Sequence, residues 1–361
     1  MIATGLAMGA TATPALAAEA VAAAIARLDG SHATGVLLFL TTAFAHNPQP
    51  ALLAASRQSQ CLQIAGCSAT GIFTEQDWVL DAPAAAAMVF TEPHSLLPTP
   101  SPTDDDIILS LAAPNAIHRE WLDHPGIRLG GVSGDVTGGG SWKVWQLGKI
   151  QSSGHVDLRI PGFTTAIGVS HGIRALTRPL TVTHSKGFEL GALDFQPALH
   201  SLLRELPLEA REETHIPLPR ILAAIIHGEP DHALSEGRYE LIPVIAVHPE
   251  RHSLTLASQL PPGSKMFWAL RQPLAAEASL RRAIERCQHQ SGQQASFAIM
   301  VNALARGPGF YNGDDRDLHI LRQEFPALPI IGFYGNHQIA AINQRNQLLE
   351  YASIFGVFSH V

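Results

Sequence analysis

The stretch Leu62-Gln-Ile-Ala-Gly-Cys-Ser-Ala-Thr-Gly-Ile72 is central to the predicted fold. Its short apolar run is typical of a buried strand, and Gly66 interrupts the run before small polar residues follow. The same form recurs at Leu328-Pro-Ile-Ile-Gly-Phe-Tyr-Gly-Asn-His-Gln-Ile339 and at Ile127-Arg-Leu-Gly-Gly-Val-Ser-Gly-Asp135. Glycine at a strand end permits positive φ and lets a ligand approach the main chain. We therefore expect three strand ends to meet around one site.

The arrangement of the other expected elements predicts an α+β fold. Closely spaced strands punctuated by glycine over residues 142–193 indicate an antiparallel meander. Both halves of the chain contain a meander, a helix, and a strand that ends at glycine. We expect two similar lobes of mostly antiparallel β-sheet covered by helices, divided into residues 1–205 and 206–361. Helices are expected at 218–227 and, with Asp314 as N-cap, at 315–325.

Composition indicates a globular protein and excludes several function classes. Hydrophobic residues make up 46% of the chain and charged residues 15%, and the net charge of -7 argues against nucleic-acid binding. Three cysteines without a C-x-x-C motif favour a reducing compartment. The Ala-rich N-terminus has no Lys or Arg before Arg27, which is unlike a signal peptide, and no apolar run is long enough to span a bilayer. We expect a cytoplasmic protein with no membrane partner.

Several short segments resemble the FIST domain family, whose chains contain an N-terminal and a C-terminal FIST domain. Gly66-Cys67-Ser68 followed by Gly71, for example, is similar to that family's Gly-Cys-Ser-Thr-Ala-Gly-Glu signature. The other segments are Gly130-Gly131 with Asp135, Ser170–Arg174 with Val182-Thr183, Arg306–Tyr311, Asp317, and Pro329–Tyr334. The resemblance runs from about Gly35 to Phe358. It implies a sensory module that binds a small ligand such as an amino acid or a related metabolite, and some family members bind haem.

Two departures from the family pattern concern the ligand. Ile72 and Gln338 stand where the family has Glu, so two carboxylates that could pair with a ligand ammonium are missing. Arg174 offers a planar fork suited to a carboxylate. These features favour a small, neutral or anionic metabolite over an amino acid.

We expect the ligand pocket to lie between the two lobes, where small polar groups and strand-end glycines converge. Its expected residues are Gly66, Cys67, Ser68, Thr70, Gly131, Asp135, His171, Arg174, Tyr334, Asn336, His337 and Gln338. The sequence predicts no catalysis, no bound metal and no obligatory cofactor. Because no transmitter segment is recognisable, a separate signalling protein is the expected partner.

Two other functions stay open at this point. A haem-binding gas sensor would use His171 or His337 as the axial ligand. A hydrolase would use Cys67 as nucleophile with one of these histidines as base, although a free cysteine in an apolar strand is more often a core residue. Metal-binding patterns are weaker, because no H-E-x-x-H occurs and Asp104-Asp105-Asp106 lacks the alternating ligands of a calcium loop. We expect that acidic run to be a solubilising loop.

Overall fold

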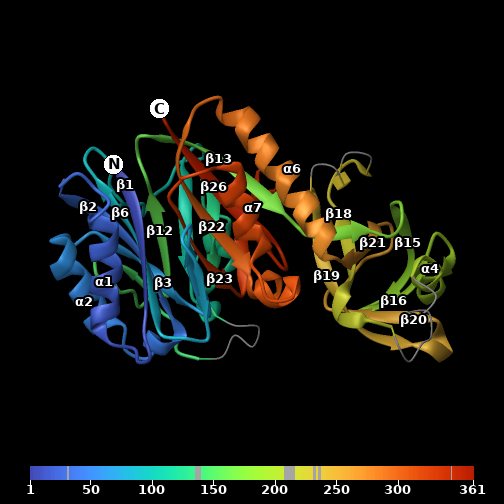
Figure 1. The fold of residues 1–361 in the computed structure, drawn as a ribbon. Helices are drawn as coiled ribbons and strands as arrows, with labels where there is room; N and C mark the ends of the chain where they lie inside the picture. Colours follow the sequence, from blue (N-terminus) through green and yellow to red (C-terminus); the bar gives the residue numbers. More distant parts are fainter. Residues whose placement is uncertain (31, 135–139, 207–215, 231–232, 235–236, 343) are drawn as a thin grey trace. The chain divides into compact units, whose positions relative to one another are not determined.

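The computed structural model in Figure 1 describes the chain except for residues 31, 135–139, 207–215, 231–232, 235–236 and 343. The chain forms two compact units, each described here by itself. The first unit contains Met1–Ser170 and Leu280–Val361, and the second contains His171–Ser279. The second unit thus interrupts the first along the chain. The division into residues 1–205 and 206–361 concerns sequence-defined domains and stays a prediction.

Three six-stranded sheets build the first unit, and we number them in chain order. Sheet 1 contains, from edge to edge, β1 (Ile2–Met8), β6 (Ala84–Thr91), β2 (Ala33–Thr41), β3 (Ile64–Ala69), β10 (Val144–Gln146) and β11 (Lys149–Ile150). Sheet 2 contains β7 (Leu97–Pro98), β12 (His155–Arg159), β8 (Ile107–Ala112), β9 (Ile127–Val132), β24 (His337–Ile342) and β25 (Arg345–Leu349). Sheet 3 contains β13 (Phe163–Ser170), β26 (Ser353–His360), β22 (Ala295–Ala303), β23 (Ile330–Gly335), β4 (Gly71–Thr74) and β5 (Trp78–Leu80).

Helices cover the outer faces of two of these sheets. α1 (Pro14–Ile25) and α2 (Gln49–Ser59) pack on sheet 1, and α7 (Arg316–Glu324) packs on sheet 3 with the part of α6 (Pro273–Ser291) that belongs to this unit (Figure 1). In the equivalent place on sheet 2, the described residues form only the short α-helix α3 (Arg119–Leu122). The inner faces of all three sheets share one apolar core, to which Phe39, Leu111 and Phe333 contribute.

The three sheets repeat one plan. Each begins with an edge strand and an antiparallel neighbour, followed by a parallel pair, which is β2–β3, β8–β9 or β22–β23. The segment of chain that supplies the first four strands of a sheet is called a repeat here. A hairpin from another repeat completes each sheet: β10–β11 of the second repeat joins sheet 1, β24–β25 of the third joins sheet 2, and β4–β5 of the first joins sheet 3. The other described pairings are antiparallel, as the sequence predicted. The repetition expected as two lobes is thus a threefold repetition within one unit.

The glycines that drew attention in the sequence occupy one equivalent position in this plan. A Cβ atom would lie 1.8 Å from the Leu38 carbonyl oxygen at Gly66, and 1.8 Å from the Ser110 carbonyl oxygen at Gly130. At Gly332 it would lie 2.1 Å from the Met300 carbonyl oxygen. Because any side chain would collide with the neighbouring parallel strand, each repeat requires glycine here.

The second unit contains an antiparallel sheet, and helix α4 (Ala198–Glu205) packs beside it. Its elements are β14 (Ile173–Ala175), β15 (Leu180–Lys186), β16 (Glu189–Leu193), β17 (Gln196–Pro197), α4 (Ala198–Glu205), β18 (Ile221–Ile226), β19 (Tyr239–His248), β20 (Ser253–Leu256) and β21 (Lys265–Arg271). In the described residues of both units, no helix combines the length and apolarity needed to cross a bilayer.

Two sequence predictions about elements were wrong. The expected helix at 218–227 is strand β18, which lies between β19 and β21; a short, wholly apolar run fits either structure by periodicity alone. The expected meander over residues 142–193 is spread over all four sheets, because β10, β12, β13 and β15 each pair with a different sheet. Close spacing along the chain therefore did not decide which strands pair.

Candidate functional site

The three strand ends singled out in the sequence meet within the first unit. The Thr70 hydroxyl donates a hydrogen bond to the Gly134 carbonyl at 3.1 Å, which joins the first and second strand ends. The Asn336 N–H donates to the Val132 carbonyl at 2.9 Å, which joins the second and third. Tyr334 pairs with Gly71 in adjacent strands of sheet 3. The predicted meeting of the strand ends is confirmed, whereas its role in ligand binding stays a prediction.

Three of the predicted site residues make contacts that stabilise the fold where the strand ends meet. Cys67 is fully buried in the shared core, and burial raises the pKa of its thiol well above the ordinary value. The Ser68 hydroxyl accepts a hydrogen bond from the Lys143 N–H at 2.9 Å. Gly131 permits close packing, since a Cβ atom there would lie 2.5 Å from Val301 Cγ1. These contacts support a structural role for all three.

Gln338 presents an unpaired donor on the inner side of the strand ends. Its Oε1 accepts a hydrogen bond from the Ala352 N–H at 3.2 Å; since a backbone N–H can only donate, this contact also fixes which end of the amide is oxygen. The Nε2 group is buried and has no hydrogen-bond partner, and the same holds for the Ser133 hydroxyl. Gln338 pairs with Gly131, which places it diagonally from Ser133 on neighbouring strands. His337, the preceding residue of β24, faces the opposite side of the sheet, with Nε2 3.6 Å from Glu350 Oε1.

A buried polar cluster extends the site onto the outer face of sheet 3. Arg306 and Asp317 are 1% and 0% exposed, and their side chains form a bidentate pair, with Nε–Oδ2 at 2.7 Å and Nη2–Oδ1 at 3.0 Å. Arg306 also donates to the carbonyl and the hydroxyl of Ser170, at 2.5 and 2.9 Å. The Tyr311 hydroxyl donates to Asp317 Oδ1 at 2.7 Å. This guanidinium therefore joins the end of β13 to the first turn of α7.

Asp315 and Tyr334 form the other side of this cluster. The Asp315 side chain accepts a hydrogen bond from the Leu318 N–H at 2.9 Å, so Asp315, and not Asp314 as expected, is the N-cap of α7. The Tyr334 hydroxyl donates to the second oxygen of the Asp315 carboxyl. Burial, followed by the nearby charge of Asp317, raises the pKa of Asp315 to about 6. Burial likewise raises the pKa of Tyr334.

The cluster is special to the third repeat, as comparison with the first repeat shows. One row across sheet 3 contains Ser170, Ser353, Asn302 and Tyr334, and the equivalent row across sheet 1 contains Ala7, Ala85, Leu40 and Ser68. In the polar row, Asn302 Oδ1 accepts a hydrogen bond from the Ser353 hydroxyl at 2.6 Å, and the buried Asn302 Nδ2 has no partner. The polar row is not required by the sheet, since sheet 1 forms the same pairings with mostly apolar side chains.

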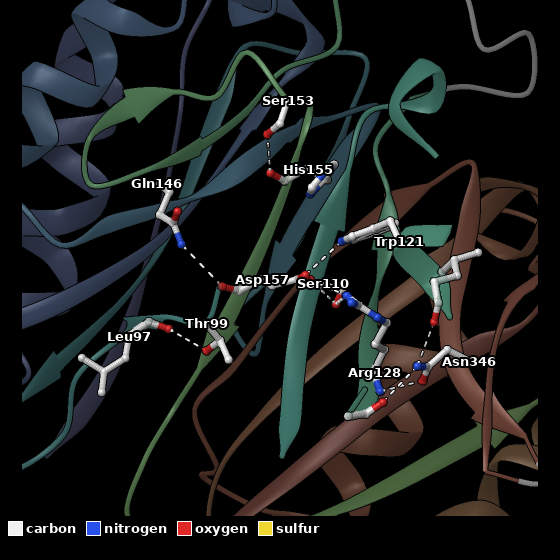
Figure 2. A network of polar contacts seen from close by, with 12 residues as sticks. Leu97, Thr99, Ser110, Trp121, Arg128, Gln146, Ser153, His155, Asp157 and Asn346 are labelled. Atoms are coloured by element: carbon white, nitrogen blue, oxygen red, sulfur yellow. Dashed lines mark hydrogen bonds and ion pairs between the residues drawn. The ribbon is translucent and has the colours of Figure 1, made fainter. Parts of the chain in front are cut away.

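A second polar network, missed in the sequence, lies on the outer face of sheet 2 (Figure 2). The fully buried Arg128 contacts Asp157 at 2.5 Å and Ser110 at 2.7 Å, and its guanidinium lies 4.7 Å from the centre of the Trp121 ring. Its Nε and Nη2 groups have no hydrogen-bond partner. The places equivalent to Ser110, Arg128 and Asp157 hold Leu38, Ile64 and Ala87 in sheet 1, and Met300, Ile330 and Phe355 in sheet 3. The available signal was an arginine inside the apolar run 127–132.

The remaining predicted site residues lie elsewhere. His171 and Arg174 belong to the second unit. The His171 Nε2 atom is 3.1 Å from the Gly237 carbonyl oxygen, and its ring is 4.5 Å from that of Tyr239, whereas Arg174 is exposed on β14. Asp135 is outside the described residues. Within the described part of the chain, His, Cys, Asp and Glu side chains form no cluster of three that could hold a metal ion.

Comparison with known proteins adds information about the C-terminal part of the chain. Residues 198–341 match the FIST C domain. FIST domains are in general sensory domains associated with signal transduction. The N-terminal FIST domain stays a prediction.

Mycobacterial proteins share the longer resemblance. An uncharacterized protein of Mycobacterium tuberculosis is 24% identical over an alignment of length 369, which covers 94% of this chain and 96% of that protein. An uncharacterized protein of Mycobacterium bovis is 24% identical over 263 residues, which cover 71% of this chain and 68% of that protein. The similarity to the first of these relatives covers parts of this chain from both units.

Proposed function

We propose that this protein is a sensory protein that binds a small metabolite at the three strand ends of the first unit and carries out no catalysis. The match to the FIST C domain supports the sensory role. The observation that carries the proposed site is Gln338, because its buried Nε2 group has no partner at the point where the strand ends meet. Leaving a buried donor unpaired costs about 1–3 kcal/mol, and a ligand acceptor would remove this cost. A cytoplasmic location and a separate protein that receives the signal are parts of the same proposal.

The unpaired groups indicate the chemistry of the ligand. Gln338 Nε2 is a donor only, and the Ser133 hydroxyl can donate as well. With Ile72 and Gln338 in place of the carboxylates of the family pattern, these positions offer no charge to an ammonium group. The ligand that fits is a small neutral or anionic metabolite whose carbonyl or carboxylate oxygens accept hydrogen bonds.

A thermal-shift screen over organic acids, amino acids and haem tests this proposal, since a ligand that binds the folded state raises the melting temperature. Hits are then measured with Gln338→Leu, which removes the unpaired donor. Gln347→Leu, on the neighbouring strand β25, is the matched control. We expect acceptor-bearing compounds to stabilise the wild type and the control, and to lose most of their effect on Gln338→Leu. If every stabilising compound acts equally on all three proteins, the proposed site is wrong.

The two other functions considered from the sequence receive less support from the described residues. The Cys67 thiol is fully buried with a raised pKa, whereas a nucleophilic cysteine needs access and a lowered pKa. An axial haem ligand needs a ring nitrogen that faces an apolar slot. The Nε2 atom of His171 lies against the Gly237 carbonyl oxygen, and that of His337 lies near Glu350. Neither arrangement favours haem.

A further inference from the structure

A pocket of about 370 Å³ lies where the chain passes from sheet 2 to sheet 3. Phe163, the first residue of β13, lines it, whereas Ser170 at the other end of β13 belongs to the polar cluster described above. Seven residues of extended strand separate the two places by about 23 Å. The pocket is therefore distinct from the proposed sensory site. Its volume is at the lower end of the range for small-molecule sites, which is about 300–1,000 Å³.

The connection between sheets 2 and 3 forms one side of the pocket. Residues 92–96 connect sheet 1 to sheet 2, and there Leu96 is 1% exposed and packs into the shared core. The connection from sheet 2 to sheet 3 consists only of residues 160–162. This shorter linker contributes Ile160 and Pro161 to the pocket lining, and Ile160 is 7% exposed and packs against the shared core.

The inner wall of the pocket is apolar and partly aromatic. Leu109 and Leu158 come from sheet 2, and Phe163 and Phe358 come from sheet 3. The two phenylalanine rings are nearly perpendicular, with centroids 6.4 Å apart. These side chains suit a ligand with a flat aromatic or short aliphatic body.

Charged groups at the rim define the other end of the ligand. Arg159 is paired with Asp106 at 2.6 Å, and Asp106 also accepts hydrogen bonds from the N–H and hydroxyl of Thr103 at 2.8 and 2.9 Å. This pair is neutral as a whole and its acceptors are occupied. The exposed carboxylate of Asp105 is then the remaining charge of the lining. We propose that the pocket binds a small organic cation, with its apolar body against Phe163 and Phe358 and its ammonium group at Asp105.

Calorimetric titration of the full chain with three matched probes tests this assignment: 2-phenylethylamine, 2-phenylethanol and 3-phenylpropanoate. We expect the amine to bind more tightly than the alcohol, and the carboxylate to bind most weakly. Asp105→Asn should weaken binding of the amine by about two- to fivefold, as an exposed ion pair allows, and leave the alcohol unchanged. Asp104→Asn, which is outside the lining, is the control. Thr165→Phe, on the pocket wall, should abolish binding of all three probes.

Other outcomes would overturn the assignment. They include tighter binding of the carboxylate, undetectable binding of the amine, equal amine affinity in Asp105→Asn, and amine binding that survives in folded Thr165→Phe protein. Gln338→Leu should bind the amine as the wild type does, because its position belongs to the other site. Loss of amine binding in that variant would contradict two separate sites.

Discussion

At the scale of single residues, Asp315 makes the stability of the first unit depend on pH. Its carboxyl has a pKa of about 6 in the folded protein, compared with an ordinary value of 3.8. The folded state therefore binds this proton more tightly than the unfolded state. The resulting stabilisation is complete below about pH 4 and is lost as the pH rises through 6. A difference of about two pKa units corresponds to roughly 3 kcal/mol in the free energy of unfolding.

Replacing Asp315 by Asn should remove this dependence, because the amide does not titrate; its oxygen can accept from the Leu318 N–H and its Nδ2 group can donate to the Tyr334 hydroxyl. We expect the stability of Asp315→Asn relative to wild type to rise between pH 4 and 7. Urea unfolding at a series of pH values measures the difference, and comparison with wild type cancels the contributions of other groups, such as His94 and His155, whose pKa values are lowered by burial. Asp314→Asn, at the exposed neighbouring position, should show no such trend. A flat difference for Asp315→Asn would contradict the raised pKa.

The buried cysteines permit a second prediction at this scale. Cys61, Cys67 and Cys287 are all buried, and burial raises the pKa of each thiol. Because the thiolate is the reactive form, iodoacetamide at pH 8 should modify none of them in the native protein during a time that suffices for complete modification in urea. Mass spectrometry of the peptides identifies the sites. Rapid native modification of Cys67 would restore the nucleophile hypothesis.

At the scale of elements, the outer face of sheet 2 shows how one repeat has replaced an apolar layer by an ionic one. Arg128, Asp157 and Ser110 stand where the other sheets have apolar residues under long helices. The short α3 lies above this place in sheet 2, and Trp121 of α3 donates to Asp157 at 2.9 Å (Figure 2). The network thus joins a short helix to three strands. The Arg128 N–H also donates a hydrogen bond to Asn346 Oδ1 at 2.9 Å, which connects the network to β25.

The equivalent residues of sheet 1 provide a direct test of this network. Arg128→Ile alone should lower the free energy of unfolding by about 3–5 kcal/mol, because it leaves Asp157 without its ion partner. The triple variant Ser110→Leu, Arg128→Ile, Asp157→Ala reproduces the sheet 1 residues and should recover much of the loss, since no buried charge remains. Urea unfolding of both variants measures the effect. A triple variant that is less stable than the single one would show that the ionic layer cannot be exchanged for the apolar one.

At the scale of the whole molecule, the repeats indicate where the second unit is inserted. In the first repeat, residues 9–13 connect β1 directly to α1, which begins at Pro14. In the third repeat, β13 ends at Ser170 and α6 begins at Pro273, and the second unit is made of the residues between them together with the start of α6, residues 273–279. Residues 171–272, which are most of the second unit, thus occupy the position of a five-residue connection.

Replacing residues 171–272 by Gly-Ala-Thr-Ala-Thr, copied from residues 9–13, should therefore leave a first unit that folds. We expect a monomeric, strand-rich protein with a single cooperative thermal transition. Circular dichroism and light scattering test this. Aggregation of this variant, with a spectrum typical of an unfolded chain, would show that the first unit depends on the inserted one.

Much of the local structure could be predicted from the sequence, because local signals decide it. The expected helix at 315–325 is α7 (Arg316–Glu324), and the glycines at the strand ends correctly indicated a meeting point. Pairing between distant strands could not be predicted, since no local feature shows that Gly71 pairs with Tyr334. The Arg306 and Arg128 networks were missed for the same reason, because their partners are far apart along the chain or appear ordinary in their own segments.

The exchange of hairpins among the three sheets has a consequence during protein synthesis. The β4–β5 hairpin emerges early, yet its partner β23 follows about 250 residues later, since Thr74 pairs with Ile331. At roughly 5–20 residues per second, the hairpin waits on the ribosome for roughly 10–50 seconds with an unpaired edge. Exposed strand edges promote wrong pairing. The nascent chain is therefore most vulnerable to misassembly well before its last strand is made, and slower translation would lengthen that period.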